Sequence, residues 1–155
     1  MSNLHPNVPR LTALLDGMEM TPTVVARLVA VAYFQARVVR DVLLDAVVPR
    51  LPPLKRGLPV RVAARIGSDE IFDTSFLDDL GSLIASLEAQ IDAGSHVYWH
   101  GDEHHTRGGY EAVFREPGVT ELCHAVADLA MLRNTAVGAL CAARGLRDAG
   151  TLLDD

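Results

Sequence analysis

The most hydrophobic part of the chain predicts one long helix that begins at Thr21-Pro22 and ends at Pro49. Threonine is a good N-cap, and proline is well suited to the first helical position. Polar side chains are confined to a narrow strip, whereas apolar residues recur around most of the circumference: Val24, Val25, Leu28, Val29, Ala32, Val39, Val42, Leu43 and Val47. A helix that is apolar almost all round lies at the centre of a fold or is covered by a partner.

Helical spacing of apolar residues predicts two more long helices, over residues 75–93 and 120–144. In the first, Ser75 and Asp78 resemble a capping box, and Gly94 is a natural stop. The second follows Pro117-Gly118, with Gly145 beyond its end. The expected core positions are Phe76, Leu80, Leu83, Ile84, Leu87 and Ile91 in the first helix, and Leu122, Val126, Leu129, Val137 and Leu140 in the second.

The remaining segments predict smaller elements. Asn7 and Pro9 begin a short N-terminal helix that ends at Gly17. Residues 49–59 form a proline-rich connector. From Val60 to Ile66, apolar residues alternate with arginine and alanine, and this period of two is typical of a half-buried strand.

Residues 96–115 predict a histidine-rich hairpin. The run from His96 to His100 and the run from Tyr110 to Phe114 would pair as strands, with residues 101–109 as the loop. Residues 60–66 could form a third strand. The whole chain, 1–155, is therefore expected to be a single, mainly α domain: a bundle of three long helices and one short N-terminal helix, with a small antiparallel hairpin or sheet appended.

Composition narrows the classes of function. The chain has 155 residues, of which 49% are hydrophobic and only 5% aromatic, so the core must consist mainly of Ala, Val and Leu. A net charge of −6 argues against broad nucleic-acid binding, which requires clustered basic residues. The longest charge-free run in the first long helix, Leu28 to Ala36, is shorter than the ~20 residues that span a bilayer. No signal peptide is evident. We therefore expect a soluble, cytoplasmic protein without membrane contact.

The two cysteines, Cys123 and Cys141, both fall on the last predicted helix. Their separation along that helix would be about 27 Å, which is far beyond the reach of a disulfide. We expect both to be small buried apolar side chains.

The histidine-rich hairpin contains the residue types that bind metals. His96 and His100 would be about 13 Å apart on a strand and could not share one ion, so only residues near the loop could converge. The candidate metal ligands are His100, Asp102, Glu103, His104 and His105. Their spacing matches no established zinc signature. We expect no cofactor, with zinc or iron as the alternative.

A second fragment, Glu121 to His124, has the spacing of one half of a di-iron carboxylate motif. Such sites need two of these motifs and two further glutamates, and the chain supplies only one motif. The simpler interpretation is an exposed polar stripe formed by Glu121, His124 and Asp128.

Two classes of function remain. The first is an interaction or assembly subunit of a larger complex, such as a ring, connector or adaptor component, that binds a protein partner or itself as a homo-oligomer. The candidate interface residues are Tyr98, Trp99, Tyr110 and Phe114, because aromatic residues are favoured at interfaces. The alternative is a metal-dependent enzyme or metal-binding protein that uses residues 96–105. No complete catalytic motif is present, so we favour the first, and whether the protein is an enzyme stays open.

Overall fold

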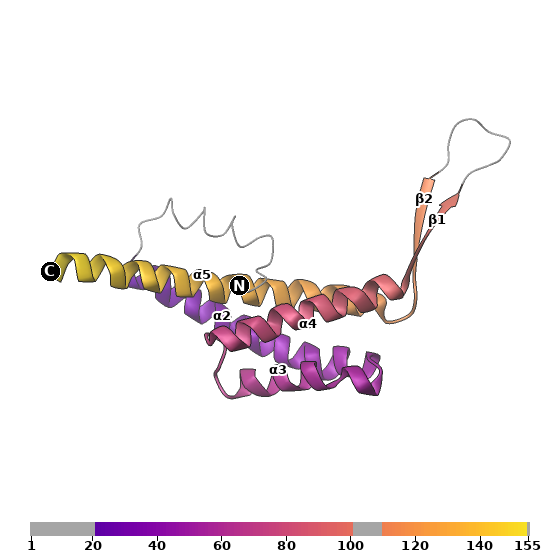
Figure 1. The fold of residues 1–155 in the computed structure, drawn as a ribbon, viewed down its shortest axis with the longest axis horizontal. Coiled ribbons are helices and arrows are strands. Elements are labelled where there is room, and N and C mark those ends of the chain that lie inside the picture. The colour runs from indigo at the N-terminus through magenta and orange to yellow at the C-terminus, as the bar shows by residue number, and fades with distance from the viewer. Residues whose placement is uncertain (1–20, 101–109, 155) are drawn as a thin grey trace.

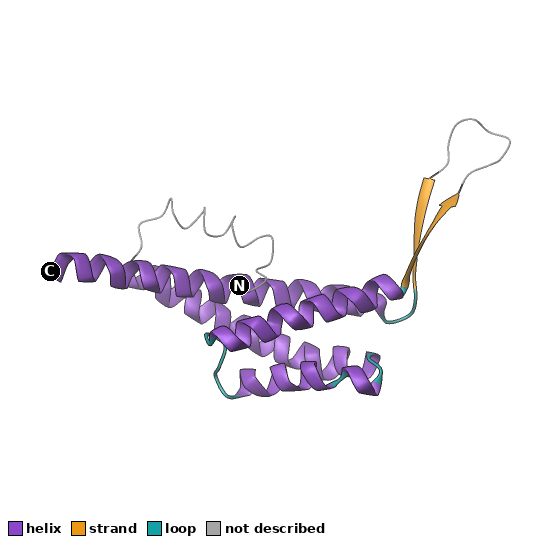
Figure 2. Cartoon of the chain, viewed as in Figure 1, coloured by secondary structure: helices purple, strands orange, loops and turns teal. Residues whose placement is uncertain are grey.

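The computed structural model describes residues 21–100 and 110–154, and within these ranges it shows a bundle of four α-helices with a projecting β-hairpin (Figures 1 and 2). The side chains of residues 97–112 and 146–154 lie outside the description. The predicted fold class, mainly α with a small antiparallel sheet, is confirmed. The elements are α2 (Pro22–Val42), α3 (Gly57–Gly67), α4 (Thr74–Ala93), β1 (Ser95–His100), β2 (Tyr110–Arg115) and α5 (Val119–Asp154).

Successive helices run in alternating directions, and α5 lies antiparallel to α2 (Figure 1). Both of these helices extend beyond α3 and α4 at the end of the bundle opposite the hairpin. Small side chains are frequent in the core of the two long helices, which allows their backbones to approach closely. These buried alanines are Ala32 and Ala36 in α2 and Ala125, Ala130, Ala136, Ala139 and Ala142 in α5.

The first long helix begins as predicted. The side chain of Thr21 caps α2 by accepting a hydrogen bond of 3.3 Å from the Val24 amide, and Pro22 occupies the first turn. After Val42 the helix widens into a π-helical turn, Leu43–Val47, in which the amide of Val48 donates to the carbonyl of Leu43. A 3-10 turn, Val48–Arg50, ends it. One stripe faces the core: Ala32, Ala36, Val39, Leu43 and Val47.

The predicted strand over residues 60–66 is wrong, because this segment lies in the helix α3. A short segment of this composition fits two periods at once. Its buried residues are spaced as on one face of a helix, and Val60, which the alternation assigned to the core, is 45% exposed. The predicted third strand therefore does not exist, and the connector 49–59 gives way to helix at Gly57. The buried residues are Pro59, Val62, Ala63 and Ile66.

Helix α4 matches its predicted range and buries the predicted stripe, with Ile91 only partly buried. The predicted capping box is wrong. The N-cap is Asp73, and Ser75 lies inside the first turn, where its hydroxyl accepts a hydrogen bond of 2.8 Å from the Arg65 guanidinium. Gly94 does follow the helix as its C-cap.

Helix α5 begins after Gly118, whose φ of +89° lies in the left-handed region that favours glycine. It continues through Gly145 to Asp154, whereas the sequence predicted an end near Arg144. Glycine weakens a helix but does not break it, so it is a stop only where other signals agree. The predicted core positions of α5 all lie in or against the core.

The predicted burial of the cysteines is wrong for Cys141, which is exposed, and Cys123 is only half-buried. Both are free thiols on α5, as their predicted separation requires.

The predicted hairpin is confirmed, because β1 and β2 pair in antiparallel register with His96 opposite Phe114 and His100 opposite Tyr110. The amide of Glu116 closes its base by donating to the carbonyl of Gly94 at 2.8 Å. The predicted N-terminal helix, from Asn7 to Gly17, lies outside the described residues.

Candidate interaction surface

The base of the hairpin is the part of the histidine-rich segment whose side chains the structure describes. The His96 Nε2 atom lies 3.3 Å from the Glu116 carboxylate, and the His96 ring stacks on Phe114 with ring centroids 6.3 Å apart. Both partners of the His96–Glu116 contact are more than half exposed. Val113 and Phe114 are 56% and 50% exposed, so the hairpin presents apolar surface beside this pair.

Most of the predicted site residues cannot be placed relative to one another. Asp102, Glu103, His104 and His105 lie outside the described residues, and His100 is described only as part of the β1 backbone. The same holds for the side chains of the interface candidates Tyr98, Trp99 and Tyr110. Of the predicted interface, Phe114 alone is described with its side chain. The metal and hairpin-interface hypotheses therefore stay predictions.

Among the side chains that the structure describes, those of residues 21–96 and 113–145, no group of three or more His, Cys, Asp and Glu could hold a metal ion. Glu121 and His124 are exposed on the first turns of α5, and Asp128 is half-buried, which agrees with a polar stripe. Glu121 makes a long ion pair of 3.9 Å with Arg50.

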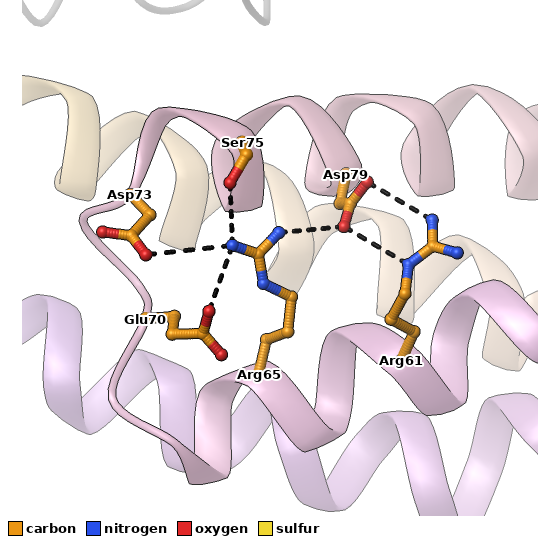
Figure 3. A network of polar contacts seen from close by, with 6 residues as sticks. All are labelled: Arg61, Arg65, Glu70, Asp73, Ser75 and Asp79. Carbon is orange, nitrogen blue, oxygen red and sulfur yellow. Dashed lines mark hydrogen bonds and ion pairs between the residues drawn. The ribbon is translucent and has the colours of Figure 1, made fainter.

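A polar network joins α3 to the start of α4 (Figure 3). The Arg65 guanidinium lies 3.1 Å from Asp79, 3.3 Å from Glu70 and 3.8 Å from Asp73, and Arg61 adds a second contact with Asp79 at 3.3 Å. Arg65 also lies over the ring of Phe76, 5.7 Å from its centroid.

The two arginines of this network face three carboxylates, so each cation has an acidic partner. Burial acts to lower the pKa of Arg65, but the hydrogen bonds and negative charges of Asp79 and Glu70 together raise that pKa above its ordinary value. The corner itself is tight, since Asp69 has a φ of 59°. We interpret the network as a clasp that fixes the α3–α4 corner, because each cation is already paired with a carboxylate.

Arg133 of α5 is a buried cation with few partners. It is fully buried, and its Nε atom donates a hydrogen bond of 2.8 Å to the Leu77 carbonyl of α4. Its two terminal amino groups have no hydrogen-bond partner among the described residues. Burial lowers the pKa of Arg133, while the charge of Asp78 acts to raise it. The burial of Arg133 could not be predicted from the sequence pattern, because an arginine without a nearby acidic partner on its helix is expected to be exposed.

A shallow groove between α2 and α5 is lined by exposed apolar side chains of both helices. Its exposed apolar members are Phe34 and Val38 of α2, which are 69% and 40% exposed, and Met131 of α5, which is 55% exposed. Val31, one turn before Phe34, is 46% exposed. The remaining lining residues are Gln35, Val39 and Asp128.

The groove also holds an unsatisfied polar atom. The side-chain oxygen of Gln35 is buried and has no hydrogen-bond partner among the described residues. Buried amide oxygens are normally paired, so this atom marks a place where a donor is missing. Sequence reasoning found that α2 is apolar almost all round, but not which face stays uncovered.

Among the described residues, two helices are long and apolar enough to cross a membrane by length and composition alone: Pro22–Arg50 and Val119–Gly145. Half of the apolar window of the second is buried inside the bundle, compared with 17% of the first. Core helices of soluble proteins pass the same test. The expected cytoplasmic location stays a prediction.

Comparisons with known proteins leave the surface as the main guide to function: no protein-family model matches the chain, and no curated protein or solved structure is significantly similar to it.

Proposed function

We propose that the protein is a helical interaction subunit of a larger assembly, which binds a protein through the groove between α2 and α5. The observation that carries this proposal is the clustering of Val31, Phe34, Val38 and Met131, all at least 40% exposed, around one groove. Single exposed apolar residues are normal on protein surfaces, but a contiguous patch is typical of a binding site.

The character of the groove favours a protein partner over lipid. Phenylalanine and methionine are enriched in the centres of protein interfaces, and a polar rim surrounds such centres. Here the rim includes Asp128 of α5 and the charged residues Arg27 and Asp41 at the two ends of the α2 patch. A carboxylate such as that of Asp128 would be costly against acyl chains, whereas a protein partner can supply donors to it.

The metal-dependent alternative concerns residues 96–105, whose loop lies outside the described residues. It stays a prediction and has its own measurement below.

Site-specific photocrosslinking in the producing cell tests the proposal. Phe34 would be replaced by benzoylphenylalanine, and the matched control would carry the same group at Leu54, an isolated leucine that is 98% exposed. We expect Phe34 to give a discrete crosslinked protein band and Leu54 to give none.

The identity of the crosslinked species, read by mass spectrometry, completes the test. A second copy of the chain or one defined other protein supports the proposal. Crosslinking that is equal at the two positions, or crosslinking of Phe34 to lipid alone, would contradict it.

A further inference from the structure

We infer that the partner in the groove is a second copy of this chain, with the α2 helices of the two copies packed antiparallel about a two-fold axis at Phe34. This inference rests on the proposed function and names the partner that the groove binds. Its basis is a self-complementary pattern of apolar and charged residues on the uncovered face of α2.

Five exposed residues of α2 lie on one stripe: Arg27, Val31, Phe34, Val38 and Asp41. Their spacing of four, three, four and three residues is the spacing of a helix-packing seam. The three central members are apolar and the two ends carry opposite charges. A solvated helix face would not need this apolar centre, whereas a helix that pairs with another helix does.

The stripe is symmetric about its centre. Arg27 and Asp41 are each seven residues from Phe34, which places both about 10.5 Å from it along the helix axis. When a second α2 helix packs antiparallel with Phe34 on the axis, Arg27 of one copy meets Asp41 of the other, and the reverse. Val31 of one copy then lies within about one residue of the level of Val38 of the other.

Charge selects this orientation over the alternative. A parallel pairing in register would bring the two copies of Arg27 opposite each other, and likewise the two copies of Asp41. Like charges held opposite each other are unfavourable. The antiparallel pairing replaces both repulsions with two ion pairs. A two-fold interface requires a surface that is complementary to itself, and this stripe meets that requirement.

The neighbouring groove residues fit the same arrangement. Met131 extends the apolar surface from α5, so that Phe34 of the second copy has apolar contacts on both helices.

Measuring the mass of the purified protein tests whether the second copy binds. By light scattering and sedimentation, from micromolar to millimolar concentration, we expect a dimer that Phe34→Asp converts to a monomer. Leu54→Asp is the matched control and should leave the dimer intact. Circular dichroism confirms that each variant remains folded. A wild-type protein that is monomeric throughout this range would overturn the inference.

Cysteine crosslinking tests the position of the axis, in a background that carries Cys123→Ala and Cys141→Ser. A cysteine at the axis faces its own copy, so Phe34→Cys should form a disulfide dimer. Val31→Cys should not crosslink to itself, because each copy lies three residues from the axis, so the two are about six residues, or about 9 Å, apart along the helix, beyond disulfide reach.

A mixture of Val31→Cys and Val38→Cys proteins should crosslink. A dimer in which Phe34→Cys does not crosslink, or in which Val31→Cys crosslinks to itself, would overturn the antiparallel geometry.

A charge exchange tests the orientation independently. Arg27→Asp and Asp41→Arg should each weaken self-association, because each puts two like-charged pairs into the interface. The double variant should restore it, and an equimolar mixture of the two single variants should form a heterodimer. Unchanged self-association in both single variants would contradict the predicted charge pairs.

The failure of this inference can be told from the failure of the proposed function. A monomeric protein whose Phe34 photocrosslink captures a different defined protein overturns the second copy but leaves the interaction subunit. A protein that is monomeric and gives no protein crosslink at Phe34 overturns both. Flotation with lipid vesicles, lost in Phe34→Asp but not in Leu54→Asp, would assign the groove to a membrane surface and also overturn both.

Discussion

Replacing Arg133 with methionine should make the protein more stable. The Arg133 side chain is fully buried, and methionine is a flexible, unbranched side chain with no polar group that needs a partner. The guanidinium stays charged in proteins, so it cannot avoid the cost of burial by losing its proton. Arg133→Met therefore removes a buried charge and fills most of the space that it occupied.

The magnitude follows from the hydrogen bonds of Arg133. One charge-assisted hydrogen bond, to the Leu77 carbonyl, is lost, and such bonds contribute about 1.5–3 kcal/mol. Two buried amino groups without partners disappear, and each costs about 1–3 kcal/mol or more when charged. We expect the free energy of unfolding to rise by about 1–3 kcal/mol. The melting temperature should rise by about 2–4 °C for each kcal/mol gained.

Urea unfolding followed by circular dichroism measures this change, with two comparison variants. Arg133→Ala leaves a cavity and should be less stable than Arg133→Met by about 2–4 kcal/mol. Arg144→Met, at an exposed position of the same helix, should change stability by less than about 0.5 kcal/mol.

The pH dependence has a defined sign. Burial lowers the folded-state pKa of Arg133, so the folded protein holds this proton less tightly than the unfolded chain. The free-energy cost of burying the charge is therefore present at all pH values below the lowered pKa and is relieved only as the pH rises through that pKa. The gain in the free energy of unfolding from Arg133→Met should be constant between about pH 6 and pH 9, because the guanidinium stays charged in this range. A loss of more than about 1 kcal/mol in Arg133→Met would refute the reasoning, because it would mean that the amino groups have partners in solution.

Three further predictions concern the clasp, the base of the hairpin and the loop. Asp79→Asn removes the charge that pairs with both arginines of the clasp, so the amides of residues 68–75 should exchange faster with deuterium, and unchanged exchange would show that the clasp does not hold the corner. Gly94→Ala should lower the free energy of unfolding by about 1–3 kcal/mol in urea titrations, because the new methyl group would lie 2.6 Å from the side chain of Val119. Gly57→Ala, which has open space around it, should change the free energy of unfolding by less than about 0.5 kcal/mol. Elemental mass spectrometry of the untagged protein should find no stoichiometric metal, and near-stoichiometric zinc or iron that is lost when the three histidines His100, His104 and His105 become alanine would replace the assembly proposal with the metal site.

The long helices could be predicted because local signals and hydrophobic spacing agree over many turns. Thr21-Pro22 and Gly94 mark real helix ends, and the apolar stripe of α4 is its buried face. The hairpin could also be predicted, since two β-favouring runs flank a glycine-containing loop.

Short segments failed where two patterns overlap. Residues 60–66 alternate like a strand, yet the same letters place Val62, Ala63 and Ile66 on one helical face. Packing against α2 and α4 decides between these readings, and a single sequence window contains no information about those partners. Gly145 failed as a stop for a related reason, because neither proline nor a turn motif follows it.

The candidate surface could be predicted only in part. The sequence indicated that α2 is either central or covered by a partner, and the structure shows that one face of the helix is buried in the bundle while another face is exposed. Ala32, Ala36 and Val39 are buried in the bundle, whereas Phe34 and Val38 are left exposed. Which face is covered depends on where α5 and α3 pack, and that is a property of the whole fold.

The π-helical turn at Leu43–Val47 has a consequence for how the chain can change in length. In an ordinary helix, removing one residue rotates everything that follows by about 100° and turns the buried face outward. A π-turn holds one residue more than the regular helix needs, so it can lose one and become regular. Leu44, which is 42% exposed, is the residue whose deletion would leave Leu43 and Val47 as core positions. This turn is therefore the point in α2 where a one-residue gap can arise while the register of the bundle is kept.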